Sequence, residues 1–310
     1  MRSKNRVATA VRIPNGEILV KTDPYIALAQ RHRILNLPIF RGAVAFVEML
    51  ILGIRTLNFS AEVALEEAEK EEAAKEGRAY VKTEKKRSTF MLVVTMTFAM
   101  AAGLGVFFYL PLAAAEGMAS LFGFSREAVW FNLVAGAVRL TLFLGYVWLI
   151  SLYSEFRRVF EYHGAEHKSI YTFELGQELT PESASRQTRF HPRCGTSFVL
   201  IVALLAILIY SVSDSIYALI AGHPPVLLVR FGVHFALLPI VAGTSYELLK
   251  LSGKTRDNIV TQVLIKPGLW LQKITTKEPS VEQLEVALAA LEASLGITES
   301  RLTSRRTTVS

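Results

Sequence analysis

Four long apolar stretches dominate the pattern of hydrophobic and polar positions along the chain. They span residues 90–115, 128–153, 198–221 and 225–246, contain 22 to 26 residues each, and carry at most one formal charge each. A helix of this length crosses a hydrocarbon core about 30 Å thick. Only residues 222–225 connect the last two stretches, so we expect these two to form a tight helical hairpin. The pattern predicts an all-α polytopic membrane protein with four transmembrane helices.

A fifth apolar segment, residues 38–59, has a different pattern. It is apolar except for Arg41, Glu48 and Arg55, which are spaced seven apart and therefore share one helical face. This is typical of a helix that lies in the membrane interface, and a fifth buried span is the alternative. The following residues 60–78 are rich in Glu, Ala and Lys and predict a solvated helix or a linker.

Short elements outside these stretches predict a small α+β cap. Pro14, Asn15 and Gly16 form a turn signal between two β-rich runs, which predicts an N-terminal β-hairpin. Near the other end, Ser280 and Gln283 form a capping box for a helix over residues 280–295, closed by Gly296. We expect the tail after this helix to be disordered.

These elements divide the chain into four segments. The segment 1–37 holds the hairpin, and 38–87 holds the interfacial helix with the charged helix or linker. The four-helix transmembrane domain spans 88–250 and includes the polar loop 154–197. The last segment, 251–310, holds the C-terminal helix and the tail.

Composition agrees with a membrane protein. Hydrophobic residues make up 51% of the chain and the mean hydropathy is +0.34, which excludes a soluble globular protein when the apolar residues come in such blocks. The first 37 residues contain no apolar core of the length that a cleavable signal peptide needs, so none is expected. The single cysteine, Cys194, excludes an intrachain disulfide and a zinc cage made of cysteines alone.

The distribution of Lys and Arg predicts the orientation. Sixteen of the 34 precede residue 88, six lie in 154–197 and nine follow Tyr246, whereas the 116–127 loop has only Arg126. This is a strong positive-inside signal, so both termini and the 154–197 loop are expected to be cytoplasmic in a multi-pass protein of the bacterial plasma (inner) membrane. The positive-inside distribution accounts for the net charge of +7. We therefore expect the lipid bilayer, and no nucleic acid, as a partner.

The chemistry concentrates just after the second stretch, where His163, Glu166 and His167 form an H-x-x-E-H motif. On a helix, the two histidines lie one turn apart on one face and can bind one metal ion. Glu166 lies between them in angle, as a general base acting on water would in the inverted zincin arrangement. The alternative is a charged helix extension with two solvated histidines.

The predicted topology brings further metal-capable side chains to the same membrane face. Residues His191 and Cys194 directly precede the third stretch, and Glu247 follows the fourth. Two imidazoles plus a thiolate or a carboxylate, with one open position for water, make a catalytic site for a divalent metal, best matched by zinc. Glu174 falls on the same helix face as His163 and is a candidate ligand or a partner of one. In the alternative, Cys194 is a small buried apolar residue and Glu247 is a helix-end carboxylate.

Formal charges inside the predicted spans also need partners. Asp214 and Arg230 both fall near the outer leaflet and are joined by the short hairpin, which predicts an ion pair between them. Arg139 and His234 lie near mid-depth. A polar pathway for an ion or a substrate is the functional alternative.

Several of these segments resemble one known family. The segments are Tyr162-His163-Gly164-Ala165-Glu166-His167-Lys168, His191-Pro192-Arg193-Cys194-Gly195-Thr196-Ser197-Phe198, Ser245-Tyr246-Glu247, Pro267-Gly268-Leu269-Trp270-Leu271-Gln272 and Thr275-Thr276-Lys277-Glu278-Pro279. They are similar to the YqhQ family, bacterial membrane proteins of unknown function described as predicted metal-dependent enzymes. The resemblance covers nearly the whole chain and implies metal dependence, but it implies no substrate. Family members usually carry a glycine-rich segment before the first strand, and this chain starts at about the end of that segment. The N-terminal β element is therefore expected to be incomplete.

The sequence therefore favours a membrane-embedded, metal-dependent hydrolase, protease-like in its motif, that acts at the cytoplasmic membrane surface. Its substrate can be a peptide, a protein or a lipid, and a homo-oligomer is left open. The alternative is a membrane assembly or scaffold protein whose metal site is structural and clamps the helices together. A transporter is the weakest interpretation, because it needs polar residues that are continuous across the bundle.

Overall fold

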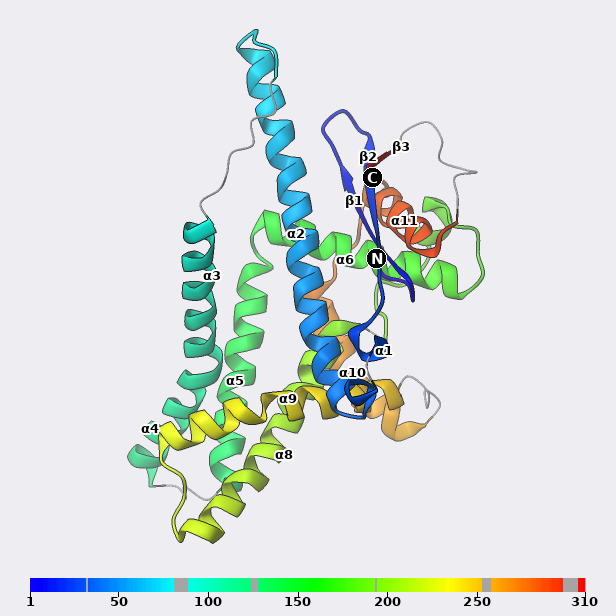
Figure 1. The fold of residues 1–310 in the computed structure, drawn as a ribbon. Helices are drawn as coiled ribbons and strands as arrows, with labels where there is room; N and C mark the ends of the chain where they lie inside the picture. The colour runs from blue at the N-terminus through cyan, green and yellow to red at the C-terminus, as the bar shows by residue number, and fades with distance from the viewer. Residues whose placement is uncertain are drawn as a thin grey trace.

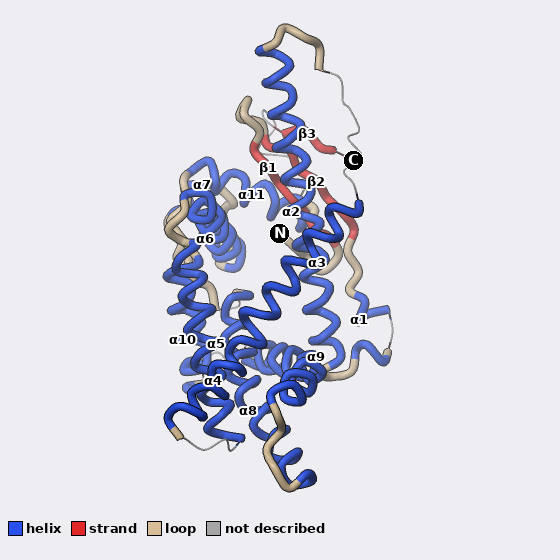
Figure 2. The backbone as a smooth tube through the Cα atoms, turned by 90° about the vertical axis from the view of Figure 1, so that its left-hand side faces the viewer, coloured by secondary structure: helices blue, strands red, loops and turns tan. Residues whose placement is uncertain are grey.

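The structure is a computed structural model and describes residues 1–31, 33–80, 89–123, 128–192, 194–252, 258–297 and 306–309. It is mostly helical, with a small sheet at one end (Figure 1). The strands lie beside the upper half of a long helix, α2, and the hairpin of α8 and α9 lies at the opposite end (Figure 2). This arrangement separates a membrane-type helical bundle from a polar cap.

Five helices of the described chain are long and apolar enough to cross a membrane. The first is α2 (Phe40–Lys75). The second is built from α3 (Thr89–Leu104), a π-helical turn (Gly105–Tyr109) and α4 (Leu110–Phe122). The others are α5 (Ala128–Ile150), α8 (Gly195–Ala221) and α9 (Leu227–Ser252).

By length and composition, the described chain therefore has one candidate span more than the four predicted. Most of residues 38–59 and 60–78 belong to one continuous helix, α2 (Phe40–Lys75), instead of a short helix and a separate solvated segment. The reason lies in the charges. Arg41 donates hydrogen bonds to both carboxylate oxygens of Glu247 on α9, and Glu48 accepts a hydrogen bond from the backbone N–H of Leu28. Because two of the three charges are partnered by protein, they need not face water.

Two boundaries also differ from the sequence-based expectation. Most of the 116–127 loop is helical, because α4 continues to Phe122 and ends at Gly123, which has a left-handed φ of 64°. Residues 124–127 lie outside the described part. The helix expected over residues 128–153 ends earlier, because α5 stops at Ile150.

Two apolar clusters hold the bundle together. In one, Phe108 packs with Ala206 and Tyr210 of α8 and Val241 of α9. In the other, Leu112 and Ala115 of α4 pack with Phe131 and Ala135 of α5. The helix α2 joins the bundle through a close backbone approach to α9. A Cβ on Gly243 would lie 2.3 Å from the carbonyl oxygen of Ile39.

The predicted N-terminal hairpin is present. Strand β1 (Arg6–Arg12) pairs antiparallel with β2 (Ile18–Pro24), and the turn contains Gly16 at a φ of 89°. Only glycine adopts this φ at low cost, which is why the Pro-Asn-Gly signal identifies the turn.

Four residues of the tail that we expected to be disordered form a strand. A third strand, β3 (Arg306–Val309), pairs in parallel with β2, so the sheet order is β1-β2-β3. This strand pairs along the edge of β2 that β1 leaves unpaired. Residues 298–305 and 310 lie outside the described part.

Helices α6 (Ser154–Glu174), α7 (Pro181–Ser185) and α11 (Val281–Leu295) build the rest of the cap. The capping box of Ser280 and Gln283 forms at the start of α11, and Gly296 ends the helix. One face of α11 packs on Ala165 and Ala184, and another packs on Ile18 and Val20 of the sheet. The helix thus ties the sheet to α6. Two short helical turns, α1 (Leu28–Arg31) and Ile34–Asn36, link the sheet to α2, and α10 (Ile259–Thr275) leads back from α9 to the cap.

Candidate metal centre

The H-x-x-E-H motif lies on α6, which begins at Ser154 after a turn and runs across the end of α5 (Figure 1). His163 and His167 are one helical turn apart, and their ring centroids are 4.4 Å apart. Both lie on the side of α6 that faces the segment before α8 and the end of α10. The two imidazoles therefore lie on one helix, although this helix is not a continuation of the span.

Cys194 completes a cluster with these two histidines. Each of the three residues offers one ligand atom, and these atoms lie within 4.8 Å of one another. His163 Nε2 lies 3.2 Å from Cys194 Sγ. His167 and Cys194 are buried, and His163 is half-buried. The structure thus brings Cys194, from the segment before α8, to two histidines of α6.

Backbone carbonyl groups fix the orientation of both imidazoles. His163 Nδ1 is 2.8 Å from the carbonyl oxygen of Thr275, and His167 Nδ1 is 2.5 Å from that of Arg189. A carbonyl oxygen can only accept, so both Nδ1 atoms carry the proton and donate it. Each Nε2 atom is therefore the one available as a metal ligand, which is the usual arrangement around metal-binding histidines.

The donor set fits zinc. Two imidazole nitrogens and one thiolate are ligands that zinc prefers, and three protein ligands leave one tetrahedral position for water or substrate. Cations that prefer oxygen ligands, such as magnesium, do not match a site made of a thiolate and two imidazoles.

The segment that carries Cys194 is held by α10. Gln272 is fully buried, accepts a hydrogen bond from the backbone N–H of His191 and donates one to its carbonyl oxygen, both at 2.8 Å. The N–H of Cys194 in turn points to the carbonyl oxygen of His191 at 3.3 Å. The amide of Gln272 thus fixes the backbone three residues before the thiol.

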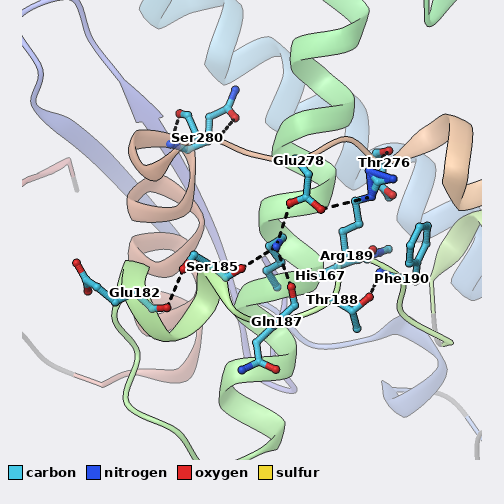
Figure 3. Close-up of polar contacts among 12 residues, drawn as sticks. His167, Glu182, Ser185, Gln187, Thr188, Arg189, Phe190, Thr276, Glu278 and Ser280 are labelled. Carbon is cyan, nitrogen blue, oxygen red and sulfur yellow. Dashed lines mark hydrogen bonds and ion pairs between the residues drawn. The ribbon is translucent and has the colours of Figure 1, made fainter.

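Charged side chains hold the preceding part of this segment (Figure 3). The ammonium of Lys168 is buried and donates to the carbonyl oxygens of Ser185 and Gln187, and it lies 3.0 Å from a carboxylate oxygen of Glu278. Arg189 also approaches Glu278, at 3.8 Å. These contacts order the segment whose Arg189 carbonyl orients His167.

The electrostatics of the cluster favour a thiolate. Burial acts to raise the pKa of the Cys194 thiol, but hydrogen bonds from His163 and His167 outweigh burial and lower the pKa from 9.0 to about 5. Burial acts to lower the pKa of His163, but the hydrogen bond and charge of Cys194 outweigh it and raise the pKa. The metal-free site therefore holds a thiolate next to an imidazole that protonates readily, and the thiolate is the form that binds metals.

Glu166 lies outside the cluster, on the wall of an adjoining cavity of about 600 Å³ that His163 also lines. After the larger effects of Cys194 and the Thr275 carbonyl, its charge also contributes to raising the pKa of His163. Glu166 is therefore a neighbour of the cluster whose carboxylate is not one of its ligand atoms.

The other three candidate ligands occupy different positions. His191 is buried, with its ring centroid 5.7 Å from that of His167, and its Nε2 lies 3.5 Å from a carboxylate oxygen of Glu174. Both therefore lie beside the cluster but outside it. Glu247 pairs with Arg41 instead. Its carboxylate is therefore part of an ion pair and not of the cluster.

The charges inside the apolar helices form a network on α5, α8 and α9, and Glu116 of α4 lies 3.9 Å from Arg230 at its edge. Arg230 Nε lies 3.1 Å from Asp214 Oδ2, and the guanidinium is 3.5 Å above the ring of Phe131. Asp214 also accepts hydrogen bonds from Asn132 at 2.9 Å and from His234 at 3.0 Å. His234 thus pairs with Asp214 and is separate from Arg139, whose Nε donates to the carbonyl oxygen of Phe107 in the π-helical turn.

Sequence reasoning missed the residues that position the cluster. Thr275 acts through its backbone carbonyl group, and a backbone contact cannot be inferred from the type of residue. Gln272 and Gly164 lie within segments that the sequence analysis singled out, and a glutamine in an apolar helix was the available signal for a buried amide. The role of Gly164 follows only from packing, since a Cβ there would lie 2.1 Å from the carbonyl oxygen of Lys277.

Comparison with known proteins agrees with the sequence resemblance. A family model described as "Protein of unknown function (DUF1385)" matches residues 37–297. The chain is 32% identical over 295 residues to "Uncharacterized protein YqhQ" of Bacillus subtilis (strain 168), a match that covers 92% of this chain and 85% of the relative. No solved structure matches the chain.

Proposed function

Since the chain belongs to the DUF1385 family, whose description assigns no activity, we propose from its own residues that it is a membrane-embedded, metal-dependent hydrolase. The observation that carries this proposal is the cluster of His163, His167 and Cys194, whose ligand atoms lie within 4.8 Å of one another beside Glu166 and a cavity. Three ligands with an adjacent carboxylate are the arrangement of catalytic zinc sites.

In this proposal each residue has one role. The Nε2 atoms of His163 and His167 and the thiolate of Cys194 hold the ion. When bound, zinc supplies a Lewis acid that makes water at neutral pH a better nucleophile. Glu166 accepts the proton of the attacking water and later delivers it to the leaving group, a role that contributes about 10² to 10⁴ in rate.

A second function, a structural metal site in a membrane scaffold, is favoured by a different observation. The cluster joins α6 to the segment before α8, and His191, whose ring centroid is 5.7 Å from that of His167, is a candidate fourth ligand beside it. A closed shell clamps elements together and leaves no position for water. The number of protein ligands on the bound metal separates the two functions.

The cellular location is part of the proposal. Five membrane-length helices support a multi-pass membrane protein, and the excess of Lys and Arg outside the 116–127 segment supports cytoplasmic termini and a site at the cytoplasmic face. Two termini on one side require an even number of crossings. In this proposal four of the helices therefore cross the membrane, and α2, which starts against the end of α9 at Glu247, does not. Reporter fusions test this orientation. A fusion after Ser310 should report from the cytoplasm and one after Gly123 from the opposite side, and the reverse labelling would contradict it.

The experiment that separates enzyme from scaffold is the Glu166→Gln variant in a strain deleted for the gene. This change keeps the side-chain volume but removes the proton acceptor. We expect the variant to keep its metal and its thermal stability in detergent, and to fail in complementation. The matched control is Glu155→Gln, which changes an exposed carboxylate in the first turn of the same helix and should complement fully.

Two outcomes would contradict the assignment in different ways. If Glu166→Gln complements fully while His163→Ala does not, the site is structural and the hydrolase assignment is wrong. If Glu166→Gln loses the metal, Glu166 is itself a ligand and the general base must be another residue.

A further inference from the structure

The cavity beside the cluster runs along the free edge of a strand. The sheet order makes β1 an edge strand, and its consecutive residues 8–12 all line the cavity. Successive side chains of a strand point to opposite faces, so a cavity lined by every residue in a row lies against the edge itself and not against one face. The opposite walls come from α2, α6 and α11, and they include His163 and Glu166.

The register shows which backbone groups of β1 face this cavity. Ile13 donates its N–H to Glu17 across the hairpin, and bonded residues alternate along an antiparallel pair. Thr9 and Val11 therefore bond to β2, whereas the N–H and C=O groups of Ala8, Ala10 and Arg12 point outward. An outward row of this kind on an edge strand is a template for another extended chain.

The protein already uses the beginning of this edge. The ammonium of Met1 donates to the carbonyl oxygen of Ala8, and the N–H of Ala8 donates to the carbonyl oxygen of Met1, both at 3.0 Å. Arg2 and Val7 form an antiparallel bridge. An extended backbone thus lies along the edge as far as Ala8, and the cavity continues from Met1 past Ala10 and Arg12.

We propose that the substrate of this site is an extended polypeptide segment, which binds as an added antiparallel strand on the edge of β1 at Ala10 and Arg12. This inference rests on the proposed function, because it names the substrate class of the same site. Main-chain hydrogen bonds supply binding that does not depend on sequence, as in other cases of strand addition. The small side chains of residues 8–11 leave room for a second backbone.

The charges along the cavity suit a segment with acidic side chains. Arg158 is exposed on the cavity wall, two helical turns before Glu166 on α6, and makes no ion pair within the described part of the chain. Arg12, also on the wall, is held by Glu285 and by the carbonyl oxygens of Gly16 and Glu282. Arg158 is therefore the cation that remains to pair with a carboxylate of the bound segment.

The reaction on such a segment is hydrolysis of one peptide bond by water. The C–N bond breaks and a C–O bond forms between the carbonyl carbon and the water oxygen. Glu166 accepts a proton from water and delivers it to the amine that leaves, so the products are a carboxylate and an amine. A phospholipid would also have an ester to hydrolyse, but its acyl chains make no use of outward N–H and C=O groups.

Hydrogen–deuterium exchange at single-residue resolution tests the docking edge without any dependence on activity. The sample is the full chain in detergent after removal of metal with a chelator, and the probe is a tryptic digest of the host cell's membrane fraction. At saturating peptide, exchange of the Ala10 and Arg12 amides should slow by about tenfold or more. The Thr9 and Val11 amides, which already bond to β2, serve as the internal control and should not change.

Two further arms identify the ligand class. Pure phosphatidylglycerol vesicles should leave the Ala10 and Arg12 amides unchanged, and protection by vesicles alone would overturn the proposal in favour of a lipid. Ala10→Pro removes one outward N–H and should raise the half-saturating peptide concentration by about tenfold, whereas Ala10→Ser keeps the N–H and should not. Exchange in the wild-type chain decides the question if Ala10→Pro does not fold.

Zinc-loaded protein then separates this inference from the function on which it rests. We expect the wild-type chain to create new N-termini in the digest and Glu166→Gln to create none. Protection of Ala10 and Arg12 without any new terminus contradicts the hydrolase and leaves the docking edge. New termini, or products released from the vesicles, without protection at these two amides contradict the docking edge and leave the hydrolase.

Discussion

Gly164 and Lys277 lie so close that no side chain fits between their backbones, since a Cβ on Gly164 would be 2.1 Å from the carbonyl oxygen of Lys277. The N–H of Lys277 donates to the carbonyl oxygen of Phe160 at 2.9 Å, so the segment after α10 is bonded directly to α6. Two residues earlier in this segment, Thr275 holds Nδ1 of His163. The contact therefore sets the position of the backbone that orients a metal ligand.

Replacing Gly164 by alanine should move this segment. The new methyl group meets backbone rather than a flexible side chain, so we expect a destabilisation of about 1 to 3 kcal/mol and a weaker hydrogen bond between Thr275 and His163. Thermal melting in detergent and zinc affinity should fall together. Gly145→Ala is the matched control, because nothing lies within 4 Å of a Cβ there. Equal behaviour of the two variants would show that the close contact does not position the site.

Gln272 should affect metal binding without touching the metal. Gln272→Ala leaves the N–H and C=O of His191 unpaired in a buried place and frees the segment that carries Cys194. Loss of such a supporting residue costs about 10- to 100-fold in metal affinity. Zinc titration against a competing chelator measures this, with the exposed Gln177→Ala as control. An unchanged affinity would show that the segment is held without this amide.

The thiol of Cys194 should titrate far below its ordinary range in the metal-free protein. The ultraviolet absorbance of the thiolate is expected to disappear on acidification with a midpoint near pH 5. Because the folded pKa lies below the unfolded one, the thiolate stabilises the fold at pH values above 9.0, and this contribution is lost as the pH falls through about 5. Zinc affinity should fall over the same acidic range, since a proton then competes for the sulfur. A midpoint near 9 would contradict the hydrogen bonds from the two histidines.

The pair of Asp214 and Arg230 should be energetically coupled. Asp214→Asn removes the carboxylate at 3.1 Å and leaves the buried guanidinium with Glu116, at 3.9 Å and one-third exposed, which costs about 3 to 5 kcal/mol. Arg230→Gln in the same chain should recover part of this loss, since neither charge then remains unpaired. A double-mutant cycle on thermal stability in detergent measures the coupling. Additive losses would show that the 3.1 Å contact carries no interaction energy.

Much of the fold follows from local pattern, because each predicted element depends on its own residues. Apolar length identifies α5, α8 and α9, and the turn at Gly16 and the capping box at Ser280 identify the hairpin and α11. The continuous helix α2 could not be predicted in this way. In the sequence, the charge of Arg41 suggested a water-facing side. In the structure, Glu247, about two hundred residues away in sequence, pairs with this charge.

In the candidate site, too, some residues follow from local spacing and others only from tertiary contacts. His163, Glu166 and His167 follow from their spacing on one helix, and the structure adds Cys194 to the two histidines. What selects Cys194 over Glu247 is tertiary: Gln272 holds the segment before α8 against α10, whereas the end of α9 lies against the start of α2. Spacing along the chain carries no information about such contacts, and a shared membrane face was too coarse a criterion.

The measurement that tests the central claim most directly is the metal content of the purified protein beside that of the His163→Ala and His167→Ala double variant. Both proteins are expressed with zinc, purified in the same detergent and analysed by elemental mass spectrometry against protein concentration. We expect about one zinc ion per chain in the wild-type protein and almost none in the double variant, because two of the three ligands are gone. Equal metal in both samples would contradict the metal centre, and the hydrolase proposed here would then have no basis.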